Sequence, residues 1–332
     1  MTEVTGASES SPFDGLGPDQ VLDAVEGAGF LCDGRFLALN SYENRVYQVG
    51  LEDAAPVVAK FYRPGRWSEQ AILEEHEFSV QLATAEIPVV APMEISGRTL
   101  LQHEEFYFAI FPRRGGRWPE LDDPDTREWL GRFLGRIHAL AATAHFQHRP
   151  ELNQQTFGIE PSVYLLESGW IPEYLRPAYR SLIDDLMAGI AASYERAGAI
   201  EQIRLHGDCH PGNILWTEEG PHFVDLDDCR TGPAVQDLWM LLSGDRAEQS
   251  VQLSDIVAGY EEFYDFDRRE LHLIEALRTL RMIHYAAWLA RRWHDPAFPQ
   301  AFPWFGNDRY WEEHVLALRE QAALLDEQPL MI

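Results

Sequence analysis

The chain changes from short apolar segments in its first third to long helical stripes in the remainder. Short apolar runs with at most one charged residue predict strands at residues 46–49, 57–62 and 106–111. Apolar residues at helical spacing predict helices at residues 19–28, 67–83, 126–142, 175–194 and 271–293. This order predicts an α+β chain in which a part that contains a sheet precedes a mainly helical part.

Length and composition suggest where the chain divides. A chain of 332 residues exceeds the size at which one hydrophobic core usually keeps growing, so we expect two domains. Residues 1–18 are rich in Ser, Gly and acidic groups and predict a flexible N-terminal arm. Pro112 ends the last predicted strand, and the basic, Gly-containing segment 113–117 is the expected linker. The predicted domains are therefore residues 19–112 and 113–332.

The formal net charge is −27, from 27 basic and 54 acidic residues. Such a surface disfavours nucleic acid and anionic membranes as partners, and it favours a basic protein segment or a cationic small molecule. No apolar run approaches the roughly 18 residues of a membrane helix. The N-terminal residues have no basic group and no apolar core of a signal peptide, and three cysteines give no disulfide framework. We therefore expect a cytoplasmic protein. We also expect a monomer.

The strongest chemical pattern lies in residues 205–216 (LHGDCHPGNILW) and 223–228 (FVDLDD). Asp208 and Asn213 are five positions apart, and Asp225 follows twelve positions after Asn213. Phosphoryl transfer needs one carboxylate to accept the proton of the attacking hydroxyl, and it needs an amide oxygen and a second carboxylate to hold Mg²⁺. The protein-kinase signature HRDxxxxN has the same Asp-to-Asn interval. The two segments therefore predict a phosphotransferase.

Two other interpretations of this stretch are weaker. The glycines and the proline of residues 207–212 form a tight loop in any case, but turn formation alone does not explain so long a pattern. A zinc site would take its ligands from four residues: His206, Cys209, His210 and Cys229. Their spacing fits no common zinc pattern, so we favour the phosphotransferase.

The predicted sheet also has features that suit nucleotide binding. Lys60 lies in the apolar strand 57–62, as does the Lys of the V-A-I-K strand in protein kinases, which contacts phosphates. The helix that follows offers three possible carboxylate partners for this lysine: Glu74, Glu75 and Glu77. Ser41 lies in the turn before the strand at 46–49, and no glycine occurs from residue 36 to residue 49. Ser41 is therefore the candidate contact for the γ-phosphate.

The HGD form of the loop resembles the aminoglycoside-phosphotransferase and choline-kinase branch of the kinase-like fold. Four longer segments resemble the stress-response kinase A family of bacteria: residues 39–48, 60–64, 225–228 and 232–240. The resemblance implies a protein-kinase-like two-lobe fold, with an N-terminal antiparallel sheet plus helix and a mainly helical C-terminal lobe. It also implies a cytoplasmic Ser/Thr protein kinase of the stress response that uses ATP and Mg²⁺ and phosphorylates a protein hydroxyl.

The resemblance assigns a role to each candidate residue. Asp208 is the expected catalytic base, Asn213 and Asp225 are the expected Mg²⁺ ligands, and Asp225 is also expected to be catalytic. Four residues are expected at the nucleotide: Ser41, Lys60, Glu75 and Phe111. Lys60 would contact the phosphates and pair with Glu75, whose distance ahead of residues 87–89 fits the family best. Backbone groups around Phe111 would hydrogen-bond the adenine.

Several points remain open at the level of sequence. The metal segment reads Asp225-Leu226-Asp227 in place of DFG, and in a strand the two aspartates would point the same way, so Asp227 is a possible second ligand. Asp237 is expected to hold the catalytic loop by hydrogen bonds, and His138, on the apolar stripe of its helix, is expected to be a packed core residue. The alternative function is a kinase of amino alcohols or aminoglycosides, and a nucleotide-binding regulator without turnover is a third possibility.

Overall fold

The computed structural model describes residues 12–39 and 41–332. Contacts group the chain into two compact units, which we name the sheet unit and the helical unit. The sheet unit consists of residues 1–67, 93–113 and 288–310. The helical unit consists of residues 68–92, 114–287 and 311–332.

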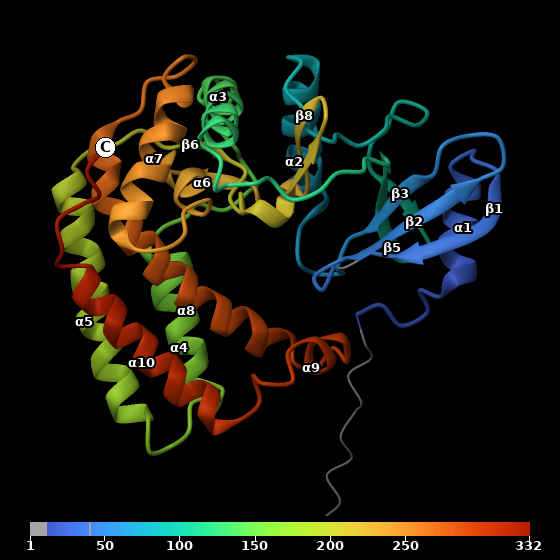
Figure 1. Cartoon of the computed structure of the whole chain (residues 1–332). Helices are drawn as coiled ribbons and strands as arrows, with labels where there is room; N and C mark the ends of the chain where they lie inside the picture. The colour runs from blue at the N-terminus through green and yellow to red at the C-terminus, as the bar shows by residue number, and fades with distance from the viewer. Residues whose placement is uncertain (1–11, 40) are drawn as a thin grey trace, which may run out of the picture. The chain divides into compact units, whose positions relative to one another are not determined.

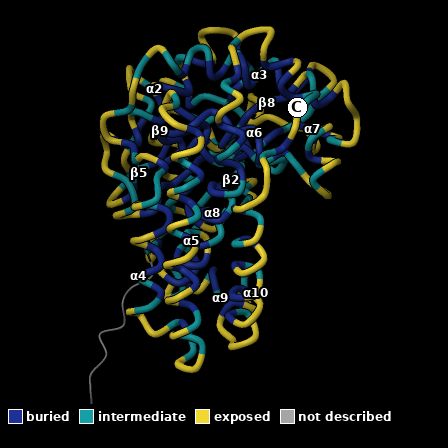
Figure 2. The backbone as a smooth tube through the Cα atoms, turned by 90° about the vertical axis from the view of Figure 1, so that its left-hand side faces the viewer, coloured by how far each residue is buried: buried dark blue, intermediate teal, exposed yellow. Residues whose placement is uncertain are grey.

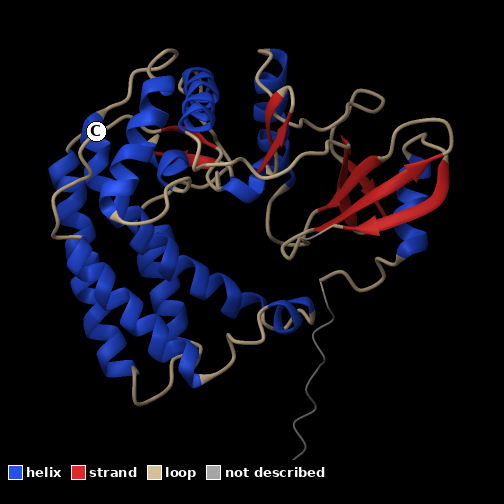
Figure 3. Cartoon of the chain, viewed as in Figure 1, coloured by secondary structure: helices blue, strands red, loops and turns tan. Residues whose placement is uncertain are grey.

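The sheet unit contains a five-stranded antiparallel sheet in the order β1-β2-β3-β5-β4 (Figure 3). Its elements are α1 (Pro18–Gly27), β1 (Cys32–Ala38), β2 (Arg45–Leu51), β3 (Val57–Phe61), β4 (Leu101–His103), β5 (Phe106–Pro112) and α9 (Ala297–Ala301). The apolar face of α1 packs on the sheet, where Val21 and Val25 share a core with Tyr47 and Phe61. The antiparallel sheet with its helix confirms the predicted first part of the chain.

The helical unit contains most of the helices and two short two-stranded sheets (Figure 1). Its helices are α2 (Glu69–Thr84), α3 (Pro124–Ala141), α4 (Glu160–Glu167), α5 (Arg176–Ala197), α6 (Val235–Trp239), α7 (Arg246–Tyr260), α8 (Ile274–Arg292) and α10 (Asp308–Leu324). Its strands are β6 (Ile203–Leu205), β7 (Ile214–Thr217), β8 (Gly220–Phe223) and β9 (Arg230–Gly232). The last turn of α8 and the first residues of α10 fall in the sheet unit.

Local sequence signals define the starts of several helices. Ser68 caps α2 by accepting a hydrogen bond from the amide of Ala71 at 3.2 Å. Asp123 caps α3 in the same way, through the amide of Thr126 at 3.1 Å, and Pro124 occupies the first helical position. Asp245 and Glu248 form a capping box at the start of α7. Helices α2 and α3 therefore begin close to their predicted starts, whereas α7 was not among the predicted helices.

Helices α3 and α7 pack closely through glycines. A Cβ atom on Gly131 would lie 1.9 Å from the carbonyl oxygen of Ile256, and one on Gly259 would lie 2.0 Å from that of Glu128. Backbone therefore meets backbone at this crossing. Elsewhere in the helical unit, α8 has buried positions along most of its length, while α10 keeps an exposed side (Figure 2).

Residues 1–11 of the predicted arm lie outside the described residues, but Phe13 is buried in the sheet unit with its ring 6.1 Å from that of Phe106. The contacts place α2 in the helical unit and residues 288–310 in the sheet unit. A functional boundary between residues 112 and 113 stays a prediction. No helix in the described part of the chain is long and apolar enough to cross a membrane.

Candidate active site

The predicted catalytic loop, residues 206–213, lies in the helical unit between two short strands. It follows β6, which pairs with β9, and it leads directly into β7 of the β7–β8 hairpin. Gly207 has φ +84°, and a Cβ atom there would lie 2.3 Å from the carbonyl oxygen of Asp228. This position therefore requires glycine both for its backbone conformation and for lack of space.

Asp237, at the start of α6, fixes the beginning of this loop. Its carboxylate is fully buried and accepts hydrogen bonds from the backbone amides of His206 at 2.7 Å and Gly207 at 2.9 Å. His138 approaches the same carboxylate at 3.2 Å through Nε2, and its Nδ1 lies 2.8 Å from the hydroxyl of Tyr260. The predictions that Asp237 holds the loop and that His138 is a packed core residue are both confirmed.

Asp208 lies among polar and cationic side chains. Its Oδ2 is 3.5 Å from Nε2 of His210, and its Oδ1 is 2.7 Å from Nη1 of Arg281 on α8. Burial alone would raise the pKa of the Asp208 carboxyl, but the hydrogen bond with His210 and the charge of Arg281 lower that pKa below its ordinary value. Asp208 is therefore ionised at neutral pH, the form that accepts a hydrogen bond from a hydroxyl group.

The side chains of His210 and Asn213 are oriented by the loop itself. Nδ1 of His210 accepts a hydrogen bond from the amide of Gly212 at 2.9 Å, so Nε2 carries the proton that faces Asp208. Nδ2 of Asn213 donates to the carbonyl oxygen of Asp208 at 3.0 Å. Because the amide nitrogen is used in this way, the amide oxygen of Asn213 is the atom left for a cation.

Asp225 is joined to the same loop through its neighbour. The amide of Val224 donates to the carbonyl oxygen of Asn213 at 3.0 Å, and Nε2 of His206 lies 2.9 Å from the carbonyl oxygen of Val224. The Asp225 side chain is exposed. Asp225 thus directly follows Val224, which is hydrogen-bonded to both ends of the catalytic loop, His206 and Asn213.

The conformation of residues 225–228 differs from the predicted strand. Asp225 has left-handed backbone angles, φ 61° and ψ 62°, and Leu226–Asp228 form one turn of 3-10 helix. The alternation argument for Asp227 is therefore wrong, since it requires extended backbone. Asp227 is buried whereas Asp225 is exposed. A short Asp side chain tolerates the left-handed region better than most non-glycine residues do.

The glutamates of α2 differ in their surroundings. Both carboxylate oxygens of Glu74 accept backbone hydrogen bonds, from Gln147 at 2.6 Å and from His148 and Arg149 at 2.7 and 3.0 Å. Glu75 is buried, and its charge is one of the causes that raise the pKa of Arg149 against the opposing effect of burial. The Glu74 carboxylate is therefore occupied by three backbone amides, whereas the Glu75 carboxylate is buried.

The sheet unit holds three of the four residues that were expected at the nucleotide, Ser41, Lys60 and Phe111, whereas Glu75 lies in the helical unit. Lys60 is buried in the middle of β3, opposite Val46 of β2 and Ala109 of β5. Its Nζ lies 5.0 Å from the ring centroid of Tyr62. Phe111 lies in β5 opposite Val58 of β3. The antiparallel register therefore places Lys60 and Phe111 on neighbouring strands of one sheet.

Ser41 begins a loop that is held by a buried ion network, which we name the Arg63 network. Arg63 donates to the carbonyl oxygen of Glu43 at 3.0 Å, and its backbone amide donates to Oδ1 of Asn44 at 3.1 Å. Asp295, from the C-terminal segment of the sheet unit, lies 2.5 Å from Arg63 and 3.2 Å from Arg45. Oε2 of Glu43 accepts a hydrogen bond from Nε1 of Trp288 at 2.5 Å. Side chains therefore fix this loop where protein kinases use glycines.

Comparison with known proteins identifies the family. Residues 35–274 match the model of the phosphotransferase enzyme family, APH. The chain is 49% identical over 320 residues to stress response kinase A of Escherichia coli strain K12, with 96% of this chain and 97% of that protein covered. It is 46% identical, over the same shares, to serine/threonine protein kinase RdoA of Salmonella typhimurium strain LT2.

The chain belongs to the stress response kinase A family. The resemblance found in the sequence is thereby confirmed, and so is the protein-kinase-like fold of the aminoglycoside-phosphotransferase type.

Solved structures share this fold at low sequence identity. The complex of amicoumacin kinase hAmiN with AMP-PNP, Ca²⁺ and Ami has a TM-score of 0.72 and 19% identity, and it covers 94% of this chain and 95% of its own. Choline kinase LicA from Streptococcus pneumoniae has a TM-score of 0.63 and 14% identity, with 92% and 99% covered. At these identities the comparison supports the fold alone.

Some residues near the catalytic loop cannot be identified from the sequence pattern. Arg281 lies 73 positions after Asp208 in the middle of a helix, and its position beside the carboxylate comes only from packing. Arg149, which donates to the carbonyl oxygens of Cys229 and Asp227, is likewise remote in sequence. Glu270 accepts from the amide of Val235 at 2.7 Å and so supports the start of α6.

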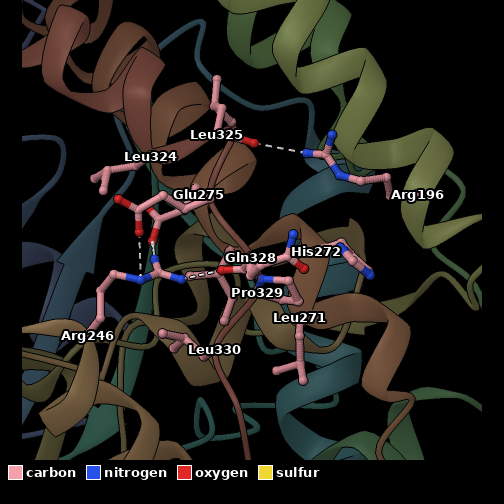
Figure 4. A pocket seen from close by; sticks show the side chains of 12 residues that line it. Arg196, Arg246, Leu271, His272, Glu275, Leu324, Leu325, Gln328, Pro329 and Leu330 are labelled. Carbon is pink, nitrogen blue, oxygen red and sulfur yellow. Dashed lines mark hydrogen bonds and ion pairs between the residues drawn. The ribbon is translucent and has the colours of Figure 1, made fainter.

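Two cavities of the helical unit have no residue of the catalytic loop among their lining residues. One, of about 20 Å³, is lined in part by residues 324–330, where Arg246 binds the carbonyl oxygen of Gln328 (Figure 4). Arg246 also pairs with Glu327 at 2.9 Å. Nearby, Arg196 donates to the carbonyl oxygen of Leu325 at 2.9 Å. The other cavity, of about 320 Å³, is lined by Arg117, Glu120, Asp123, Asp125, Thr126, Trp129 and Trp216.

Proposed function

We propose that the chain transfers the γ-phosphate of ATP to Ser or Thr hydroxyls of proteins. The observation that carries the proposal is that hydrogen bonds hold Asp208, Asn213 and the segment before Asp225 together. Asn213 donates to the carbonyl oxygen of Asp208, and the amide of Val224 donates to that of Asn213. The names of its relatives support a protein acceptor, since one of them is a serine/threonine protein kinase. The relatives' name also supports a role in a stress response.

In this proposal Asp208 is the base. The acceptor hydroxyl donates a hydrogen bond to the Asp208 carboxylate while its oxygen forms a new bond to the γ-phosphorus. The bond from that phosphorus to the bridging oxygen breaks, ADP leaves with the electron pair, and the proton passes to Asp208. Because its pKa is lowered, Asp208 serves mainly to orient the hydroxyl, and it takes the proton as the new bond forms.

The donor set suits Mg²⁺. The amide oxygen of Asn213 and the exposed carboxylate of Asp225 are hard oxygen ligands of the kind that Mg²⁺ prefers. Within residues 12–39 and 41–332, no three His, Cys, Asp or Glu side chains gather as a metal cluster, so phosphate oxygens and water would complete the coordination shell. When bound, the cation would neutralise charge on the phosphates. Asp227 is buried and is not part of the proposed ligand set.

The proposed nucleotide contacts follow the family pattern. Lys60 would contact the phosphates, Ser41 would lie at the γ-phosphate, and backbone groups around Phe111 would bind the adenine. Glu75 is the proposed carboxylate partner of Lys60, because Glu74 is occupied by three backbone amides. We also propose a cytoplasmic location, a monomeric state and a functional boundary at residues 112–113. These three points rest on the sequence.

Transfer of labelled γ-phosphate tests the function. The protein is incubated with Mg²⁺ and labelled ATP, and either a mixture of Ser/Thr-containing proteins or a panel of amino alcohols and aminoglycosides is offered. We expect acid-stable label on Ser or Thr of protein. Asp208→Asn should reduce transfer by at least about 1000-fold while ATP affinity stays within a few-fold.

Asp185→Asn, an exposed Asp-to-Asn change on α5, is the matched control and should keep full transfer. Label found only in small molecules would move the chain to the alternative function with the same catalytic residues. Normal turnover in Asp208→Asn would show that the base is wrongly assigned.

A further inference from the structure

The catalytic carboxylate is paired with an arginine from another element. Nη1 of Arg281, on α8, lies 2.7 Å from Oδ1 of Asp208. The Asp208 side chain is 22% exposed and that of Arg281 is 37% exposed, so the pair lies at the edge of solvent. Within residues 12–39 and 41–332, this is the one polar or ionic contact of the Arg281 guanidinium.

The two oxygens of the Asp208 carboxylate differ in their partners. Oδ1 is shielded from solvent and receives no hydrogen bond of normal geometry from the described residues, although Arg281 is close to it. Oδ2 faces Asn213 and His210, each at 3.5 Å. An acceptor hydroxyl that binds this carboxylate therefore comes close to the guanidinium of Arg281.

The charged group in direct contact with the Asp208 carboxylate at Oδ1 is a cation, Arg281 at 2.7 Å. The carboxylates around the loop have partners of their own: Asp228 pairs with Arg230 at 2.7 Å, and Asp237 accepts hydrogen bonds from two backbone amides at the start of the loop. The Oδ1 side of Asp208 thus presents a cation, although the chain as a whole has a net charge of −27.

We propose that Arg281 is a specificity residue for the acceptor, and that it selects Ser/Thr segments with a negatively charged group beside the hydroxyl. This inference rests on the proposed function, in which Asp208 binds that hydroxyl. A carboxylate or phosphate next to the acceptor residue pairs with the Arg281 guanidinium, which is charged at all physiological pH values and suits such anions by its shape.

The same arginine acts against cationic acceptors. In a site for an amino alcohol or an aminoglycoside, the ammonium group needs unpaired carboxylates close to the reacting hydroxyl. Here the carboxylate of Asp208 is already neutralised by Arg281, and a second cation would meet like charge at short range. The positive charge of Arg281 therefore favours acidic protein segments over cationic small molecules as acceptors.

Two peptides test the proposal. They share one serine and the same length, and they carry either Glu or Lys on both sides of that serine. The full chain is assayed with Mg²⁺ and ATP, and kcat/KM is determined for each peptide. We expect wild type to prefer the Glu peptide at least about tenfold, Arg281→Gln to bring the ratio near one, and Arg281→Glu to favour the Lys peptide.

Arg319→Gln is the matched control, because Arg319 is exposed on α10 and should leave the ratio unchanged. Melting temperatures establish that both Arg281 variants are folded, and reversal of preference is an effect that a merely structural role would not produce. Equal use of both peptides by wild type, or an unchanged ratio in Arg281→Gln, overturns the inference and leaves the proposed function intact. Absence of transfer to any protein or peptide would refute the proposed function, and this inference with it.

Discussion

Arg63 and Asp295 are 232 residues apart in the chain and form a buried ion pair, with Nη2 of Arg63 2.5 Å from Oδ2 of Asp295. The same guanidinium donates to the carbonyl oxygen of Glu43, in the loop that begins at Ser41. The C-terminal segment of the sheet unit therefore contacts the proposed nucleotide loop through Arg63. Arg45, which pairs with Asp295 at 3.2 Å, and Trp288, which donates to Glu43, add further links.

The first prediction concerns Asp295→Asn. Loss of the carboxylate removes the Asp295 partner of Arg63 and Arg45 in a buried site and leaves Glu43 as the carboxylate beside Arg63, at a cost of about 3 kcal/mol in the free energy of unfolding. We expect the loop to loosen and the KM for ATP to rise about tenfold, with a smaller change in kcat. Steady-state kinetics with varied ATP measure this. The control is Asp53→Asn, in an exposed turn of the same unit, and an unchanged KM for ATP would contradict the prediction.

The second prediction concerns Asp237→Asn. The carboxylate accepts from two consecutive backbone amides, and an amide side chain would turn its NH₂ group toward one of them. We expect kcat to fall about 100-fold, because the catalytic loop shifts while the reacting groups stay intact. Asp184→Asn, exposed on α5, should show wild-type kinetics. If kcat stayed within about threefold of wild type, the clamp would not be needed for catalysis.

The third prediction concerns the crossing of α3 and α7. A Cβ at position 131 would lie 1.9 Å from the carbonyl oxygen of Ile256, and backbone cannot move aside as a flexible side chain can. Gly131→Ala should therefore lower the free energy of unfolding by about 3 kcal/mol or more, measured by urea denaturation. Gly27→Ala, at the end of α1 with no atom within 4 Å of the new Cβ, should change it by about 1 kcal/mol at most. Equal effects of both changes would contradict the packing argument.

The fourth prediction concerns pH. Burial raises the pKa of Glu270 to about 7, against the hydrogen bond from Val235, which lowers it. The ordinary value is 4.5, so between pH 4.5 and 7 the folded state binds more protons than the unfolded state does. The contribution of Glu270 therefore disfavours folding increasingly as pH rises through this window, by on the order of 3 kcal/mol in total.

Glu270→Gln removes this ionisation and keeps a carbonyl oxygen as acceptor for Val235. The difference in unfolding free energy between the Glu270→Gln variant and wild type should grow in favour of the variant as the pH rises from about 5 to about 8. Urea denaturation at several pH values measures it, with the exposed Glu320→Gln as control. Parallel pH curves for Glu270→Gln and wild type would count against a raised pKa.

Local sequence patterns predicted those parts of the site that are formed by consecutive residues. The strand that carries Lys60 and the tight loop that leads from Asp208 to Asn213 each have their own spacing signal, and each forms as expected. Asp225 itself was assigned to a strand, because an apolar residue between two aspartates looks extended. Its left-handed backbone depends on the turn into the 3-10 helix that follows, which the alternation does not show.

Tertiary pairing explains what the sequence could not predict. Arg281 and Asp295 are ordinary charged residues in their own segments, and their roles arise only when α8 and the C-terminal segment pack near distant loops. Strand β1 gave a weak signal for a different reason. It is an edge strand with mostly exposed side chains, so it lacks the alternation of a half-buried strand.

The sheet unit is made of three separate stretches of the chain, and the last of them is residues 288–310. During synthesis the five strands and α1 emerge early, but Asp295 and Trp288 follow only after the chain has grown by about 180 further residues, which takes roughly 9 to 36 s at ordinary rates of synthesis. Until then Arg63 and Glu43 lack these partners. The first third of this protein therefore cannot complete the Arg63 network on the ribosome ahead of the rest, and a nascent chain stalled before residue 288 would hold the sheet without the Asp295 and Trp288 contacts of that network.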